Sequence, residues 1–120
     1  MILEALHTTI NPILSAHPLI GDIEAELPFC LYKADAEVIR DKTGIIGYSY
    51  LVDVGIVATD IGTVNTHTQT ITAAIVAMSG TINSTIIEAV IHTNESGVYF
   101  ATADQVYIND LEFKIFTKNR

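Results

Sequence analysis

The sequence predicts a single α+β domain over residues 1–120, in which two amphipathic helices pack on one face of a mainly antiparallel four-stranded sheet, in the order α-β-(long loop)-β-α-β-β. The length supports one domain, because 120 residues can bury one core but not two. Ile, Val and Thr, which favour extended backbone, supply about a third of the chain. Two segments with apolar residues at helical spacing supply the helices.

The first helix is predicted at the start of the chain. Its apolar residues recur at helical spacing: Ile2, Leu3, Leu6, Ile10, Ile13 and Leu14. Pro12 lacks a backbone donor and disfavours a helical residue before it, so we expect a kink near Asn11 or two short helices. Residues 19–22 then form a turn, and residues 27–33 form the first strand.

The segment over residues 34–47 is predicted to be a long polar loop or an extended arm. At about a dozen residues it is longer than a compact domain needs for a connection, and loops of that kind usually have a function. Its charged residues are the ones we expect at an interface between subunits: Asp35, Glu37, Arg40, Asp41 and Lys42.

The clearest strand covers residues 48–58, where the alternation predicts one buried face. A single long helix follows it, with an apolar stripe made of Ile61, Val64, Thr68, Ile71, Ile75, Met78 and Ile82. Asp60 or Thr63 can cap the first amides of this helix, and Asn83 with Ser84 can end it.

The C-terminal part of the chain returns to extended structure. Residues 85–93 form a strand, residues 94–97 a turn, residues 98–101 a short apolar piece and residues 105–118 the last strand. Within the last strand the apolar residues change phase, so we expect a bulge or a bend near Asn109 and Asp110.

The charge distribution excludes several functional classes. Six Lys and Arg against fourteen Asp and Glu give a net charge of −8, and no Lys or Arg occurs between Thr43 and Phe113. A groove for nucleic acid needs clustered cations, so tight binding to phosphates is not expected. No apolar run approaches the length of a membrane span and no basic leader opens the chain, so we expect a soluble protein that is not secreted.

The sequence contains no residue set typical of catalysis, of a cofactor or of a metal. The four histidines fall on four different predicted elements, and the single cysteine, Cys30, lies in an apolar strand where a buried thiol is the usual role. The glycines match neither a P-loop nor a dinucleotide fingerprint. We therefore expect no enzyme, no cofactor and no metal site.

Several features follow one another in a pattern that covers almost the whole chain. They are the opening helix, the turn Leu19-Ile20-Gly21-Asp22-Ile23, the strand Leu27-Pro28-Phe29-Cys30-Leu31-Tyr32, the long strand with the helix after it, and a closing strand with Phe113 and Phe116. This pattern resembles the tail-completion, or tail-terminator, proteins of long-tailed bacteriophages and prophages.

The resemblance implies a non-catalytic virion component, made in the bacterial cytoplasm and located in the virion tail. Such a protein forms a hexameric ring that caps the head-proximal end of the tail tube, stops tube polymerisation and joins the tail to the head connector. Its partners would be itself, the tail-tube protein and the connector, with no membrane. DNA would only pass through, since an acidic channel repels phosphates.

Two alternatives stay open. The chain could be a small-molecule-binding or enzymatic α+β domain with a site built from Tyr48, Tyr50, Glu88 and His92. It could also be another joining protein of the virion, such as a head-tail connector component.

Overall fold

The structure is a computed structural model that describes residues 2–18 and 27–118. The turn expected at residues 19–22 lies outside the described residues. The elements are α1 (Ile2–Ile10), β1 (Ala16–Pro18), β2 (Phe29–Asp41), β3 (Gly44–Ala58), α2 (Ile61–Val76), β4 (Gly80–Ile82), β5 (Thr85–Glu95), β6 (Tyr99–Ala101) and β7 (Val106–Lys118).

One sheet joins the strands of the described residues, in the order β1-β2-β3-β7-β5-β4, with β6 pairing on β7. β1 is parallel to β2, and the other pairs are antiparallel. The predicted fold class, with a four-stranded sheet and the order α-β-(long loop)-β-α-β-β, was therefore wrong. The described residues contain seven strands, and three of them are only three residues long.

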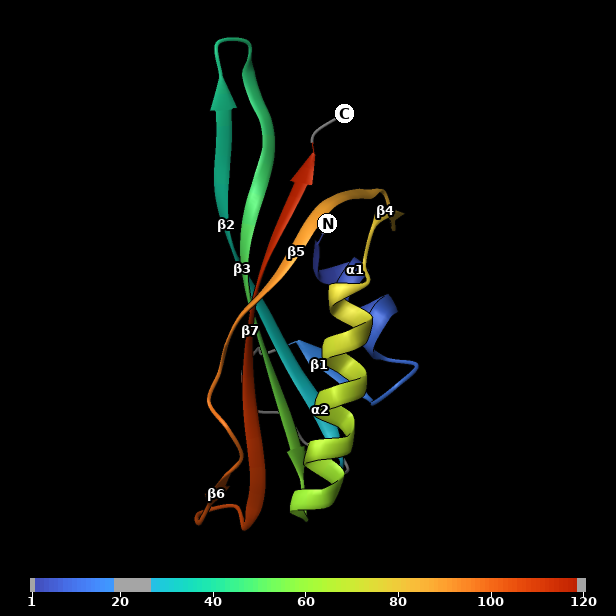
Figure 1. Cartoon of the computed structure of the whole chain (residues 1–120), viewed down its shortest axis with the longest axis vertical. Helices are drawn as coiled ribbons and strands as arrows, with labels where there is room; N and C mark the ends of the chain where they lie inside the picture. The colour runs from blue at the N-terminus through green and yellow to red at the C-terminus, as the bar shows by residue number, and fades with distance from the viewer. Residues whose placement is uncertain (1, 19–26, 119–120) are drawn as a thin grey trace.

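Both helices lie on the same side of the sheet (Figure 1). α1 ends at Ile10, where the amide of Asn11 still bonds to the carbonyl of His7 at 2.9 Å. Pro12 has no amide hydrogen to continue this pattern, so the helix ends there and does not kink. A single turn follows, in which the amides of Ile13 and Leu14 bond to the carbonyl of Ile10 at 2.9 and 3.1 Å.

α2 begins where the sequence predicts, with Asp60 as its N-cap. It ends at Val76, earlier than the apolar stripe predicts, with Ala77 as its C-cap. Gly80, with a positive φ of 69°, then begins β4. Met78 and Ile82, the last two residues of the stripe, follow the helix and still pack on the core. The stripe therefore predicts which residues are buried but not where the helix ends. Asn83, expected to end α2, instead turns β4 into β5 and donates to the carbonyl of Glu4 at 3.0 Å.

The core lies between the two helices and the central strands. Its largest fully buried side chains include Ile2, Leu6, Ile10, Val52, Val54, Ile56, Val64, Ile71, Ile75, Leu111, Phe113 and Ile115. Each such side chain contributes about 1.5–3 kcal/mol by leaving water, so this layer holds the fold together.

β7 carries no bulge near Asn109 and Asp110, so of the two predicted alternatives, a bulge or a bend, the bulge is wrong. The register of β3 against β7 is continuous from Gly47 to Ala58, and the irregularities lie in the pairing of β5 with β7. The apolar residue of the opposite phase, Ile108, faces the side away from the helices, where it and Tyr99 line one cavity. Apolar side chains are therefore at least partly covered on both faces of β7 in this region. The change of phase needs no shift in the register of β7 against β3.

The β2–β3 hairpin projects beyond both helices, as Figure 1 shows, in a molecule of 51 × 25 × 23 Å. Residues 34–47, predicted as a long polar loop or extended arm, form the outer part of this hairpin. We call residues 36–48 the arm. At its tip, Asp41 Oδ1 accepts bonds from the Thr43 amide at 2.7 Å and from the Thr43 hydroxyl at 2.6 Å, and Gly44 has a φ of 123°. The arm therefore has a defined turn and paired backbones.

Candidate functional site

The arm exposes large apolar side chains next to charged ones. Val38, Ile45 and Ile46 are 41%, 39% and 42% exposed. Arg40, Asp41 and Lys42 lie between them in sequence and are exposed as well. A strand that projects from the body with apolar side chains in solvent is typical of a surface that binds another protein.

The five charged residues predicted at an interface all lie in β2 or its turn, in two groups. Asp35 and Glu37 line a cavity of about 330 Å³ near the base of the arm, together with Ser49, Leu51 and Lys114. Arg40, Asp41 and Lys42 lie at the tip, where Arg40 pairs across the hairpin with Ile45. The apolar residues of the tip are not among the predicted interface residues, because the charged residues around them predict a long polar loop or an extended arm.

Two edges of the sheet are open in the part of the chain that the structure describes. β1 pairs with β2 only at residues 30–32, so the outer edge of β2 has no strand partner from Lys33 onward. β4 pairs with β5 only at residues 85–87, which leaves the outer edge of β5 open toward Glu95. Unpaired edges present backbone donors and acceptors that can pair with another chain.

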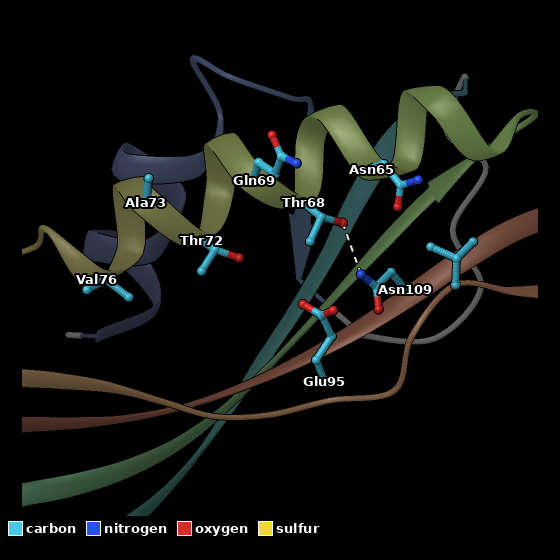
Figure 2. Close-up of a pocket in the computed structure, with 9 residues that line it drawn as sticks. Asn65, Thr68, Gln69, Thr72, Ala73, Val76, Glu95 and Asn109 are labelled. Atoms are coloured by element: carbon cyan, nitrogen blue, oxygen red, sulfur yellow. Dashed lines mark hydrogen bonds between the residues drawn. The ribbon is translucent and has the colours of Figure 1, made fainter.

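A groove of about 580 Å³ lies between α2 and the ends of β5 and β7. Figure 2 shows its polar side chains: Asn65, Thr68 and Thr72 from α2 face Glu95 of β5 and Asn109 of β7. Asn109 donates through Nδ2 to the Thr68 hydroxyl at 3.1 Å. We call this region the α2 groove.

Two buried oxygen atoms of the α2 groove have no hydrogen-bond partner among the described residues. They are Oδ1 of Asn109, a residue only 1% exposed, and Oγ1 of Thr72. The sequence carried a signal for Asn109, because it is the one amide in the phase of β7 that also holds Leu111, Phe113 and Ile115. Buried polar atoms in folded proteins are nearly always paired, with protein groups or with ordered water, so these two oxygens are places where a donor can bind.

The face of the sheet away from the helices carries two local polar contacts between side chains. Lys33 and Asp53 form an ion pair at 3.6 Å, and Tyr99 donates to Asp110 Oδ2 at 2.7 Å. The hydrogen bond to Asp110 raises the pKa of Tyr99 above its ordinary value, with burial and the charge of Asp110 adding to the rise. An exposed ion pair of this kind contributes little to stability.

The residues of the enzymatic alternative do not come together. Tyr48 and Tyr50 lie on β3 with ring centroids 5.9 Å apart, whereas Glu88 and His92 lie on β5, and β7 separates the two strands. The His92 ring stacks on Phe113 at 4.8 Å. None of the three cavities described here is lined by any of the four.

Cys30 is fully buried, and burial raises the pKa of its thiol to about 12. A thiol with that pKa stays protonated at neutral pH and is a poor nucleophile. In residues 2–18 and 27–118, no three His, Cys, Asp or Glu side chains gather as a metal site would require. Within the same residues, no helix is both long and apolar enough to cross a membrane.

Comparison with known proteins gives a structural similarity and no sequence family. No protein-family model and no curated protein matches the chain. The fold matches a chain from the solved structure described as the virion of a native gene transfer agent (GTA) particle, with a TM-score of 0.70 and 13% identity. The match covers 98% of this chain and 85% of that one. The chain therefore shares its fold, over nearly its whole length, with a protein of a virion particle.

Proposed function

We propose that this chain is a non-catalytic structural protein of a phage-like virion, which caps the head-proximal end of the tail tube as a ring of identical copies. In this role it ends tail polymerisation and joins the tail to the head connector. The observation that carries the proposal is the projecting arm with exposed apolar and charged side chains, on a fold shared with a virion protein.

A ring needs two different surfaces on each copy, one of which meets the other on the next copy. The open edges of β2 and β5 are the two opposite edges of the sheet, with β3 and β7 between them. The arm lies on the β2 side, and the α2 groove lies on the β5 side. This placement supports contact between identical copies in a head-to-tail direction, which closes into a ring when the rotation between copies divides a full turn.

The charge of the chain fits the passage of DNA. With a net charge of −8, a ring of several copies would surround its channel with an excess of carboxylates. Like charges repel, so a genome would slide through such a channel and would not bind to its wall.

Electron microscopy of the protein mixed with tail tubes assembled from the tube protein of the same genome tests the proposal. We expect ring-shaped density at one end of each tube and an arrest of tube growth. A matched protein without the arm, described in the Discussion, serves as the control. Tubes that stay bare and keep growing, or binding to the connector alone, would contradict the proposed function.

A further inference from the structure

We propose that the arm of one copy docks in the α2 groove of a neighbouring copy, where Arg40 meets the carboxylate of Glu95 and the free oxygen of Asn109. This inference rests on the proposed function, because it takes self-assembly as given and assigns the two surfaces that meet.

The α2 groove presents hydrogen-bond acceptors. Asn109 Oδ1 is a buried acceptor without a partner among the described residues, and Glu95 places a second acceptor at the exposed rim (Figure 2). Neither group can donate when Glu95 is ionised. A group that binds in the α2 groove must therefore bring hydrogen-bond donors, and a positive charge suits it best.

The α2 groove has no cation of its own, whereas the arm carries two. The segments that line the α2 groove lie between Thr43 and Phe113, and this stretch of the sequence contains no Lys or Arg. The arm carries two of the six positive residues of the chain, Arg40 and Lys42. A guanidinium offers five donors in a planar fork, which can serve a carboxylate and an amide oxygen together.

Apolar contacts add a second, independent match. The α2 groove includes Ala73, Val98 and Val76, the last of which is 47% exposed. The arm exposes Val38 and Ile46 near its cations. Docking would cover apolar side chains on both surfaces, which favours binding, while the charge pair fixes the orientation of the arm.

The contact must join two molecules. Figure 1 shows the tip of the arm at one end of the longest axis, beyond both helices, while α2 lies beside the other half of the sheet. An arm that points away from its own groove can reach only the groove of another copy. Each copy would use its arm once and its groove once, as a closed ring requires.

A charge exchange tests the pairing in the full chain. We expect Arg40→Glu and Glu95→Arg each to weaken self-association about tenfold or more, measured by mass photometry and on tube ends. The double variant should recover association to within about threefold of the unchanged protein, because it restores the pair in the reverse order. The control is Glu88→Arg, which makes the same charge change on β5 outside the α2 groove and should have little effect.

A cross-linking experiment gives an independent result. Proteins carrying Arg40→Cys and Glu95→Cys are mixed under oxidising conditions, and a disulfide between the two different chains is expected. A mixture of Arg40→Cys with Glu88→Cys should give no such product.

The outcomes separate this inference from the proposed function. Two results would overturn the docking of the arm in the α2 groove: rings that form normally with Glu95→Arg, or a double variant that associates no better than the single ones. Neither result would contradict the proposed ring at the tube end. A chain that never self-associates, in solution or on tube ends, would overturn both.

Discussion

Two aspartates shape the local turns of this chain. Asp60 caps α2 by accepting the Thr63 amide at 2.7 Å and the Thr63 hydroxyl at 2.8 Å. Asp41 accepts the same two groups from Thr43 at the tip of the arm. For Asp60 the backbone bond is the larger cause of a lowered pKa, and for Asp41 the side-chain bond is. Both carboxylates are therefore held in the charged form by local donors.

Replacing Asp60 tests whether its carboxylate stabilises the start of α2. Asp60→Ala removes both acceptors and should lower the melting temperature by about 4 °C, measured by circular dichroism. Asp60→Asn keeps one acceptor oxygen and should lower the melting temperature by less than Asp60→Ala does. Equal melting temperatures for all three proteins would contradict the assigned cap.

The pH dependence of the cap follows from the direction of the shift. The pKa of Asp60 is lowered from its ordinary value of 3.8 in the folded protein, so the contribution of the charged cap is complete above that pH. It is lost as the pH falls below 3.8 and through the lower folded pKa. The difference in melting temperature between the unchanged protein and Asp60→Ala should shrink over that range.

Among the elements, β3 holds the molecule together and also supplies one of the two strands of the arm. It pairs with β7 along its inner part and with β2 along nearly its whole length. Gly47 sits at the end of the pairing with β7, where β3 leaves the body of the sheet. A Cβ added at this glycine would overlap the backbone carbonyl oxygen of Thr117.

Gly47→Ala should therefore lower the free energy of unfolding by about 2 kcal/mol, because the two backbones must move apart. Gly55→Ala, on the same strand, is the matched control. Its added Cβ would meet only the flexible Asp110 side chain at 3.3 Å, so a change within about 1 kcal/mol is expected. Urea unfolding measures both, and equal effects would show that the strands can separate at Gly47 without cost.

At the scale of the whole molecule, folding and assembly use different parts of the chain. The buried side chains lie between the helices and the inner halves of the strands, whereas the outer arm is mostly exposed. A free arm with little buried surface contributes little to the stability of one copy.

Shortening the arm should abolish assembly and leave the stability of one copy nearly unchanged. Replacing residues 39–47 with Asn-Gly joins the paired residues Val38 and Tyr48 by a two-residue hairpin turn. The unfolding free energy should change by no more than about 1 kcal/mol, and ring formation on tube ends should be lost. Calorimetry and electron microscopy measure the two properties. A shortened protein that still forms rings would remove the arm from the assembly surface.

The sequence predicted part of the candidate site. Arg40, Asp41 and Lys42 were expected in a projecting segment, and they lie at the tip of the arm. Their role at a subunit interface stays a prediction. Glu95 and Asn109 are not predicted as partners, because the α2 groove forms only when α2 packs over both strands. Asn109 does stand out in the sequence as an amide in the apolar phase of β7, but nothing there joins it to Glu95.

The sequence by itself determined the features that depend on neighbouring residues. Pro12 ended α1, Asp60 began α2, and the alternation of β3 placed its buried face. Only the tertiary structure decided the number of strands, the paired arm and the α2 groove. Strands of three residues are too short to show a period, and backbone pairing can hold a polar hairpin whose side chains carry no apolar alternation. A groove between segments far apart in the chain exists only after packing, which no local pattern encodes.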